Sequence, residues 1–165
     1  MDFIQRGISD EYGLRFIYVD VSGTSDVLAQ RHLDGPAAGE VLSQALASVA
    51  LLSSDLDNED ECVSIQWMLN GPIQGVLVEA AYGGRLRGYT YRKTLPEFDG
   101  RLNIDFSQVL GTEGEMVVLQ SVPGNLVYSG RVSATPPDIP RNLARDYNQS
   151  RQTPTGVELA VRRDA

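Results

Sequence analysis

Residues 36–56 read PAAGEVLSQALASVALLSSDL and predict the long helix on which the fold depends. Pro36 suits the first turn, where its missing N–H would have no partner within the helix. Apolar side chains then recur at spacings of three and four, at Val41, Leu42, Ala45, Leu46, Val49, Leu52 and Leu56. Such spacing places them on one face of a helix. We expect the helix to bury this face against the rest of the chain.

Two strand patterns and a shorter helix precede the long helix. Phe3–Ile8 and Leu14–Val21 are apolar-rich runs separated by a polar loop that ends in glycine, which is typical of a β-hairpin. Both faces of the second run carry apolar side chains, so we expect it to lie between packed layers. The shorter helix is expected over Asp26–His32, after a break that contains serine and glycine and offers an N-cap.

The runs that follow the long helix have the order of an antiparallel meander. Val63–Leu69, Ile73–Ala81 and Leu86–Arg92 are strand patterns separated by an Asn-Gly-Pro turn and a pair of glycines. Two further strands, a short amphipathic helix and a last strand that could close the sheet are expected over Glu115–Ser121, Leu126–Ser133, Ile139–Ser150 and Val157–Val161. The pattern predicts an α+β fold, with mostly antiparallel sheet and one long and several shorter helices packed on it. We expect residues 1–165 to form a single domain.

Composition bounds the class of protein. Of the 165 residues, 42% are hydrophobic and 22% are charged, which is typical of a globular domain. No apolar run approaches the ~20 residues that cross a bilayer, and the N-terminus lacks the basic start and apolar stretch of a secretion signal. We therefore expect a cytoplasmic protein that does not bind membranes. The net charge of −8 argues against a nucleic-acid partner, because such proteins neutralise phosphates with basic groups.

The sequence offers little catalytic or metal-binding chemistry. It contains neither a phosphate-binding G-x-x-x-x-G-K-[ST] loop nor a G-x-S-x-G nucleophile motif. Nothing in the spacing of Cys62 and His32 supports a catalytic pair. The acidic stretch Asp55–Glu61 fails as a calcium loop, since Asp60 stands where the loop needs glycine and Gln66 where it needs glutamate. We therefore expect a protein that is not an enzyme and holds no cofactor.

Short motifs occur in a distinctive order along the chain. They are Arg31-His32 ahead of Pro36-Ala37-Ala38, Asn70-Gly71-Pro72-Ile73-Gln74-Gly75, Leu86-Arg87-Gly88-Tyr89, Gly111-Thr112-Glu113-Gly114, Tyr128-Ser129-Gly130-Arg131-Val132 and Ser150-Arg151-Gln152-Thr153-Pro154-Thr155. In this order and spacing, the chain resembles the N-terminal domain of the heat-shock protein 33 family, the redox-regulated cytosolic holdase chaperones. The resemblance extends from the first strand to Val161.

The resemblance implies a compact α+β domain that binds unfolding polypeptides without ATP and tends to form a homodimer. Members of the family continue into a linker and a C-terminal zinc-binding switch with a C-x-C pair and a C-x-x-C pair. This sequence has only Cys62, which cannot make a four-thiolate zinc site. We therefore expect the zinc and redox domain to be absent, with no zinc cofactor and no activation by disulfide formation.

Two functions are compatible with these observations. The first is a client-binding chaperone domain, for which we expect Met68, Tyr89 and Tyr91 to contribute apolar surface, because they fall opposite or beside the presumed core face. The family pattern does not pick these residues out. The alternative is a non-catalytic interaction or assembly module that keeps the fold and recruits one specific folded partner. Capture of one stoichiometric partner, rather than a range of unfolded polypeptides, would favour the alternative.

Overall fold

The computed structural model describes residues 1–101 and 103–162, so the last three residues of the expected 1–165 domain lie outside the described part. In chain order, the described elements are β1 (Phe3–Ser9), β2 (Leu14–Asp20), α1 (Ser22–His32), α2 (Pro36–Ser53), β3 (Cys62–Leu69), β4 (Gly75–Ala81), β5 (Arg85–Thr90), α3 (Pro96–Asp99), α4 (Phe106–Leu110), β6 (Gly114–Val122), β7 (Asn125–Ser133) and α5 (Ile139–Gln149). The expected α+β fold class is confirmed.

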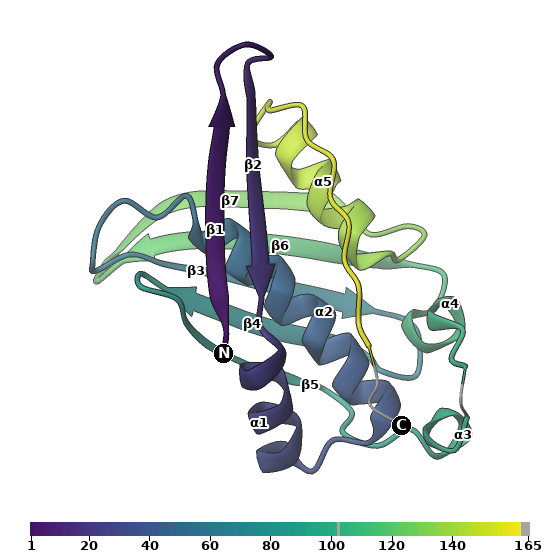
Figure 1. Cartoon of the computed structure of the whole chain (residues 1–165). Helices are drawn as coiled ribbons and strands as arrows, with labels where there is room; N and C mark the ends of the chain where they lie inside the picture. Colours follow the sequence, from purple (N-terminus) through teal and green to yellow (C-terminus); the bar gives the residue numbers. More distant parts are fainter. Residues whose placement is uncertain (102, 163–165) are drawn as a thin grey trace.

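The strands form two separate sheets. Five of them make one antiparallel sheet in the order β5-β4-β3-β6-β7, while β1 and β2 pair only with each other among the described residues. The expected meander is therefore β3-β4-β5, and β6 joins the other edge of β3. Figure 1 shows the hairpin of β1 and β2 crossing in front of α2 and extending beyond the body of the molecule.

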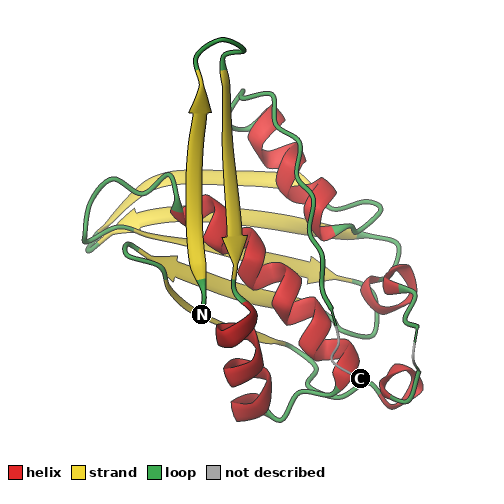
Figure 2. Cartoon of the chain, viewed as in Figure 1, coloured by secondary structure: helices red, strands yellow, loops and turns green. Residues whose placement is uncertain are grey.

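The long helix α2 covers the large sheet and organises the core. Figure 2 shows α1, α2 and α5 on the same side of this sheet. The buried positions of α2 include Ala37, Ala38, Val41, Leu42, Ala45, Leu46, Val49 and Leu52. They share one core with the inward side chains of the sheet, which include Val63, Ile65, Trp67, Val76, Val78, Met116 and Val118. Each fully buried large aliphatic side chain stabilises the fold by about 1.5–3 kcal/mol.

Helix α1 begins at Ser22, four residues before the expected start at Asp26. The carboxylate of Asp2 accepts hydrogen bonds from the backbone N–H groups of Gly23 and Thr24, each at 2.8 Å. The carboxylate of Asp20 accepts from the backbone N–H of Ser22 at 2.9 Å, so the helix start is held both from the chain terminus and from the end of β2. A search for an N-cap among the residues after β2 therefore places the helix start too late.

Two of the short motifs, those that begin at Asn70 and at Gly111, pack on each other at one end of the sheet. The side-chain oxygen of Asn70 accepts hydrogen bonds from the backbone N–H groups of Thr112 (2.9 Å) and Glu113 (3.0 Å). A Cβ atom on Gly71 would lie 2.3 Å from the carbonyl carbon of Leu110, so only glycine permits this approach. The contact fixes the β3–β4 turn against the segment that leads into β6.

The segment after α5 differs from the prediction. The expected strand Val157–Val161 pairs with no strand among the described residues, although Val157 and Leu159 pack against the core. Apolar and polar side chains alternate in this segment, as they do in a strand. Here the apolar side chains pack against the core without any backbone pairing to a described strand. In Figure 1 this segment runs across the helix layer. The short helices α3 and α4 were not predicted, since each spans less than two turns and carries no periodic pattern.

A buried ionic cluster holds the start of this last segment, and we call it the Arg151 anchor. Arg151 Nε donates to Asp146 Oδ2 at 3.2 Å, and a second guanidinium nitrogen lies 3.7 Å from Asp55. The guanidinium carbon lies 4.5 Å from the ring centre of Tyr128 and 5.4 Å from that of Tyr147. Asp146 is fully buried. Burial, together with the nearby charge of Asp55, raises the pKa of Tyr147 well above its usual range.

Within residues 1–101 and 103–162, no helix has the length and apolar character needed to cross a membrane.

Candidate functional site

The face of the large sheet that points away from α2 is the candidate functional site, and we call it the outer face. Successive side chains of a strand point to opposite faces. In β3, Val63, Ile65 and Trp67 point into the core, so Gln66 and Met68 lie on the outer face. The described helices α1, α2 and α5 all lie on the opposite side (Figure 2). The outer face is therefore the side of the sheet open to a partner.

The three residues expected at a binding surface lie on this outer face and near one another. Tyr89 and Tyr91 are 46% and 37% exposed, and their ring centres lie 6.0 Å apart in a stacked arrangement. Met68 is half-buried and pairs across the strands with Gly75. A Cβ atom on Gly75 would lie 3.0 Å from the ring of Tyr91, so this ring rests directly over the glycine. The structure thus brings Met68, Tyr89 and Tyr91 into one patch.

A hydrogen bond fixes one side of this patch. The side-chain amide of Gln66 donates to the hydroxyl of Tyr91. Tyr91 follows the last residue of β5, and its backbone N–H donates to the carbonyl of Gly75 at 2.9 Å, so both ends of the residue are held. An aromatic ring held in this way presents apolar area at little cost in conformational entropy.

The apolar area continues across the sheet beyond the expected residues. Leu77 and Val117 are half-buried and pair with Gln66 from opposite sides, and Leu119 is 39% exposed one step further along β6. Sequence reasoning missed Val117 and Leu119 because their place on this face depends on β6 pairing with β3. The alternation of apolar side chains within β6 can be read from the sequence, but this pattern does not identify the strand with which β6 pairs.

Paired charges border the apolar area on both sides. Glu79 forms an ion pair with Arg87 at 2.6 Å, and Glu115 forms one with Arg131 at 2.7 Å. The hydrogen bond to Glu79 raises the pKa of Arg87 above its already high usual value. Exposed pairs of this kind contribute about 0–1 kcal/mol each. Their main effect is to neutralise charge beside the apolar patch.

A second exposed apolar surface lies on the hairpin of β1 and β2, and we call it the hairpin stripe. It consists of Phe3, Leu14, Phe16 and Tyr18, which are 40–61% exposed. The rings of Phe3 and Tyr18 lie 5.6 Å apart, and the ring of Phe16 covers Gly7. The expectation that β2 lies between packed layers is therefore wrong: Ile17 and Val19 face the helix layer, while the opposite face meets solvent.

The single cysteine and histidine make different contacts. Cys62 is half-buried at the start of β3, with its sulfur 3.2 Å from the hydroxyl of Ser121. His32 ends α1 and interacts electrostatically with Asp34. Burial raises the pKa of the Asp34 carboxyl, and the charges of His32 and Lys93 oppose that rise. Neither Cys62 nor His32 is part of a described group of three or more residues able to hold a metal ion, because residues 1–101 and 103–162 contain no such group.

The acidic stretch after α2 contributes to structure. Asp55 pairs with Arg15 and with Arg151, and it accepts a hydrogen bond from the hydroxyl of Tyr147 at 3.1 Å. Glu61 accepts a hydrogen bond from the backbone N–H of Asp57 at 2.7 Å, which lowers the pKa of Glu61. These carboxylates tie the loop to the hairpin and to α5.

Comparison with known proteins gives a consistent result. The 33 kDa chaperonins of Trichodesmium erythraeum and Thermus thermophilus are 27% and 31% identical to this chain over 161 and 166 residues. These alignments cover 97% and 98% of this chain but 52% and 48% of those proteins, so the chain spans about half the length of the curated relatives it matches.

The fold itself matches a solved structure. The crystal structure of the 33 kDa chaperonin (heat shock protein 33 homolog) from Thermotoga maritima superposes with a TM-score of 0.81 at 24% sequence identity. The superposition covers 92% of this chain and 52% of that one. At the level of sequence families, residues 2–165 match the family described as Hsp33 protein. Because this match extends over nearly the whole chain, the protein belongs to the Hsp33 family.

Proposed function

We propose that this chain is an ATP-independent, holdase-type chaperone domain that binds unfolding polypeptides on the outer face. The observation that carries the proposal is the patch of Met68, Tyr89 and Tyr91, which continues into Leu77 and Leu119 and is bordered by neutralised charges. Contiguous exposed apolar area of this kind is typical of surfaces that bind other polypeptides. Membership of the Hsp33 family and the chaperonin names of the relatives support the same function.

The proposal includes a non-enzymatic, cytoplasmic protein in which residues 1–165 act as one domain without a metal or other cofactor. A four-thiolate zinc switch cannot be assembled from these residues, because they contain one cysteine. Client binding by this domain therefore does not depend on a disulfide formed within it. We expect neither nucleic acid nor membranes among its partners. Peroxide followed by a thiol reductant should leave the suppression of client aggregation unchanged, and a large thiol-reversible activation would contradict this part of the proposal.

The test is light scattering from a heat-unfolding reporter enzyme, with and without the chain, in reducing buffer. We expect suppression of scattering at a near-stoichiometric ratio. The triple variant Met68→Ser, Tyr89→Ser, Tyr91→Ser should need several-fold more protein for the same suppression. A matched control replaces three exposed apolar side chains elsewhere, at Tyr12, Val27 and Leu33, with serine.

The outcomes separate the two functions. Equal suppression by both triple variants would refute the outer face as the binding surface. Folded wild-type protein that suppresses no aggregation but captures one stoichiometric folded partner would favour the interaction-module alternative. Retained cooperative unfolding, measured by the fluorescence of the buried Trp67, shows that each variant is folded.

We also propose a homodimer in which two copies of the hairpin stripe pack together. A two-stranded hairpin with a solvent-exposed aromatic face is marginally stable alone, and a two-fold contact would bury the same stripe from each copy. Sedimentation velocity should report a dimer for the wild type. The variant Phe16→Ser, Tyr18→Ser should sediment as a monomer, and a wild-type monomer at high protein concentration would overturn the proposal.

A further inference from the structure

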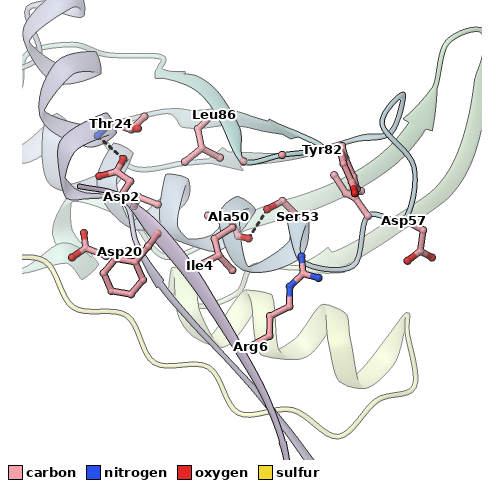
Figure 3. Close-up of a pocket in the computed structure, with 15 residues that line it drawn as sticks. Asp2, Ile4, Arg6, Asp20, Thr24, Ala50, Ser53, Asp57, Tyr82 and Leu86 are labelled. Carbon is pink, nitrogen blue, oxygen red and sulfur yellow. Dashed lines mark hydrogen bonds between the residues drawn. The ribbon is translucent and has the colours of Figure 1, made fainter.

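A pocket at the base of the hairpin lies apart from the outer face. Its volume is about 570 Å³, and its lining comes from β1, the start of α1, the end of α2 and the turn between β4 and β5. Pockets that hold small organic groups or side chains span about 300–1,000 Å³. Figure 3 shows Ile4 beside Ala50 in the middle of this lining, with Leu86 and Tyr82 on the opposite side.

One face of β1, which carries Ile4 and Arg6, borders the pocket together with the edge of the strand that does not pair with β2. Phe3 and Ile4 point to opposite faces of the hairpin, yet both line the pocket. On its other edge β1 pairs with β2, and no other described strand pairs with it. The backbone N–H and C=O groups along the pocket side of β1 therefore have no strand partner in the described chain. Such an edge is a template for an added strand.

Charged side chains line the pocket at both of its ends. Asp2 and Asp20 lie at one end, and both stay ionised at neutral pH. Burial opposes ionisation of Asp2, but hydrogen bonds from Thr24 and Gly23 lower its pKa, and hydrogen bonds from Ser22 lower that of Asp20.

Arg6 lies at the other end of the pocket, and the lining on the side away from Asp2 and Asp20 also includes Asp57 (Figure 3). Arg6 forms no ion pair with any side chain of residues 1–101 or 103–162. Four residues of extended strand separate Asp2 from Arg6, which corresponds to about 13 Å. Figure 3 shows the Arg6 side chain reaching toward Ser53, at the opposite end from Asp2 and Asp20.

We propose that this pocket binds an extended peptide segment that adds to the free edge of β1, with a basic side chain at the Asp2–Asp20 end and an acidic one near Arg6. Residues four apart in an extended peptide have the same ~13 Å separation. Between the charged positions, an apolar side chain of the segment packs against Ile4 and Ala50. The inference rests on the proposed function, since the segment comes from an unfolding client, and it adds a sequence preference that the apolar outer face does not supply.

The test is fluorescence anisotropy with a labelled six-residue peptide, acetyl-Lys-Thr-Val-Thr-Glu-Val-amide, in which the lysine, the central valine and the glutamate share one face of the extended chain. Asp20→Asn and Arg6→Gln should each weaken its binding by about three- to fivefold, as expected for loss of one exposed charge contact. The matched control is Asp26→Asn, which makes the same charge change at an exposed position outside the pocket. This control should leave binding unchanged.

Two further probes test the charge pattern and the strand geometry. Arg6→Glu should bind the first peptide more weakly but gain affinity for a peptide with lysine at both charged positions. A peptide with proline in place of the central valine should bind at least tenfold more weakly, because proline cannot donate to a strand edge. Equal binding of the proline peptide, or no difference between Asp20→Asn and Asp26→Asn, would overturn the inference. Aggregation suppression measured in parallel reports the proposed function separately, since it can persist when peptide binding fails.

Discussion

The Arg151 anchor gives the sharpest test of what stabilises this fold. Arg151→Ala removes the partner of the fully buried carboxylate of Asp146, the ion pair with Asp55 and the cation stacked on Tyr128. Removing one member of a buried ion pair costs about 3–5 kcal/mol, because the remaining charge stays buried without its counter-charge. We expect about 3 kcal/mol, since the hydroxyl of Tyr128 still donates to Asp146 at 3.1 Å.

Urea unfolding followed by tryptophan fluorescence measures this loss. Trp67 is the only tryptophan and is fully buried, so its emission reports the core. With a slope near 2 kcal/mol per molar urea, a loss of about 3 kcal/mol lowers the midpoint by roughly 1.5 M. The corresponding decrease in the thermal midpoint is about 6–12 °C for a domain of this size.

The control is Arg141→Ala. Arg141 is 81% exposed and lies 3.6 Å from Asp138, so its ion pair contributes at most about 1 kcal/mol. The double variant Asp146→Leu, Arg151→Met should lose less stability than Arg151→Ala, because it removes both buried charges. Equal midpoints for Arg151→Ala and Arg141→Ala would refute the reasoning that burial gives the anchor its importance.

Three further changes test other parts of the fold. Asp34→Asn should raise the thermal midpoint at pH 7 but not at pH 3. Burial raises the pKa of Asp34 above its usual 3.8, so its charge destabilises the fold only at pH values where the carboxyl is ionised. An equal gain at both pH values would contradict this. Gly75→Ala should lower the free energy of unfolding in urea by more than about 2 kcal/mol, since the φ of Gly75 is +155° and a Cβ would lie 2.4 Å from the carbonyl oxygen of Trp67. The control Gly124→Ala, with open space around it, should lower it by about 1 kcal/mol. Leu42→Ala should cost about 3–5 kcal/mol by leaving a cavity under the sheet, and folded protein should still suppress client aggregation at low temperature; a cost below 1 kcal/mol would show that the site collapses.

Much of this fold is visible in local patterns. The stripe from Val41 to Leu52 predicted α2, and alternation in Val63–Leu69 predicted β3. The paired glycines at 83 and 84 marked the β4–β5 turn, where both have positive φ. These features depend on residues close together in the chain, so a pattern of period two or 3.6 is sufficient to identify them.

The features that the sequence did not reveal depend on distant contacts. The solvent exposure of the hairpin stripe could not be predicted, because the sequence pattern of an apolar strand face is the same whether that face packs on a helix or contacts solvent. Val157–Val161 has the alternation of a strand without a strand partner. In the candidate site, Tyr89 and Tyr91 could be chosen from the alternation of the run Leu86–Arg92, but Val117 and Leu119 required the pairing of β6 with β3.

That pairing has a consequence for synthesis on the ribosome. The central strand β3 pairs on one edge with β4, which follows it closely in the chain. Its other edge pairs with β6, whose last residue is synthesised roughly 50 residues after β3. At about 5–20 residues per second, this interval lasts roughly 3 to 10 seconds. During that time the nascent chain presents an unpaired strand edge beside Trp67, and Met116 has not yet covered its position opposite it. A protein of a chaperone family thus passes through a stage in which it is itself prone to aggregation, and slower translation between residues 70 and 122 would prolong that stage.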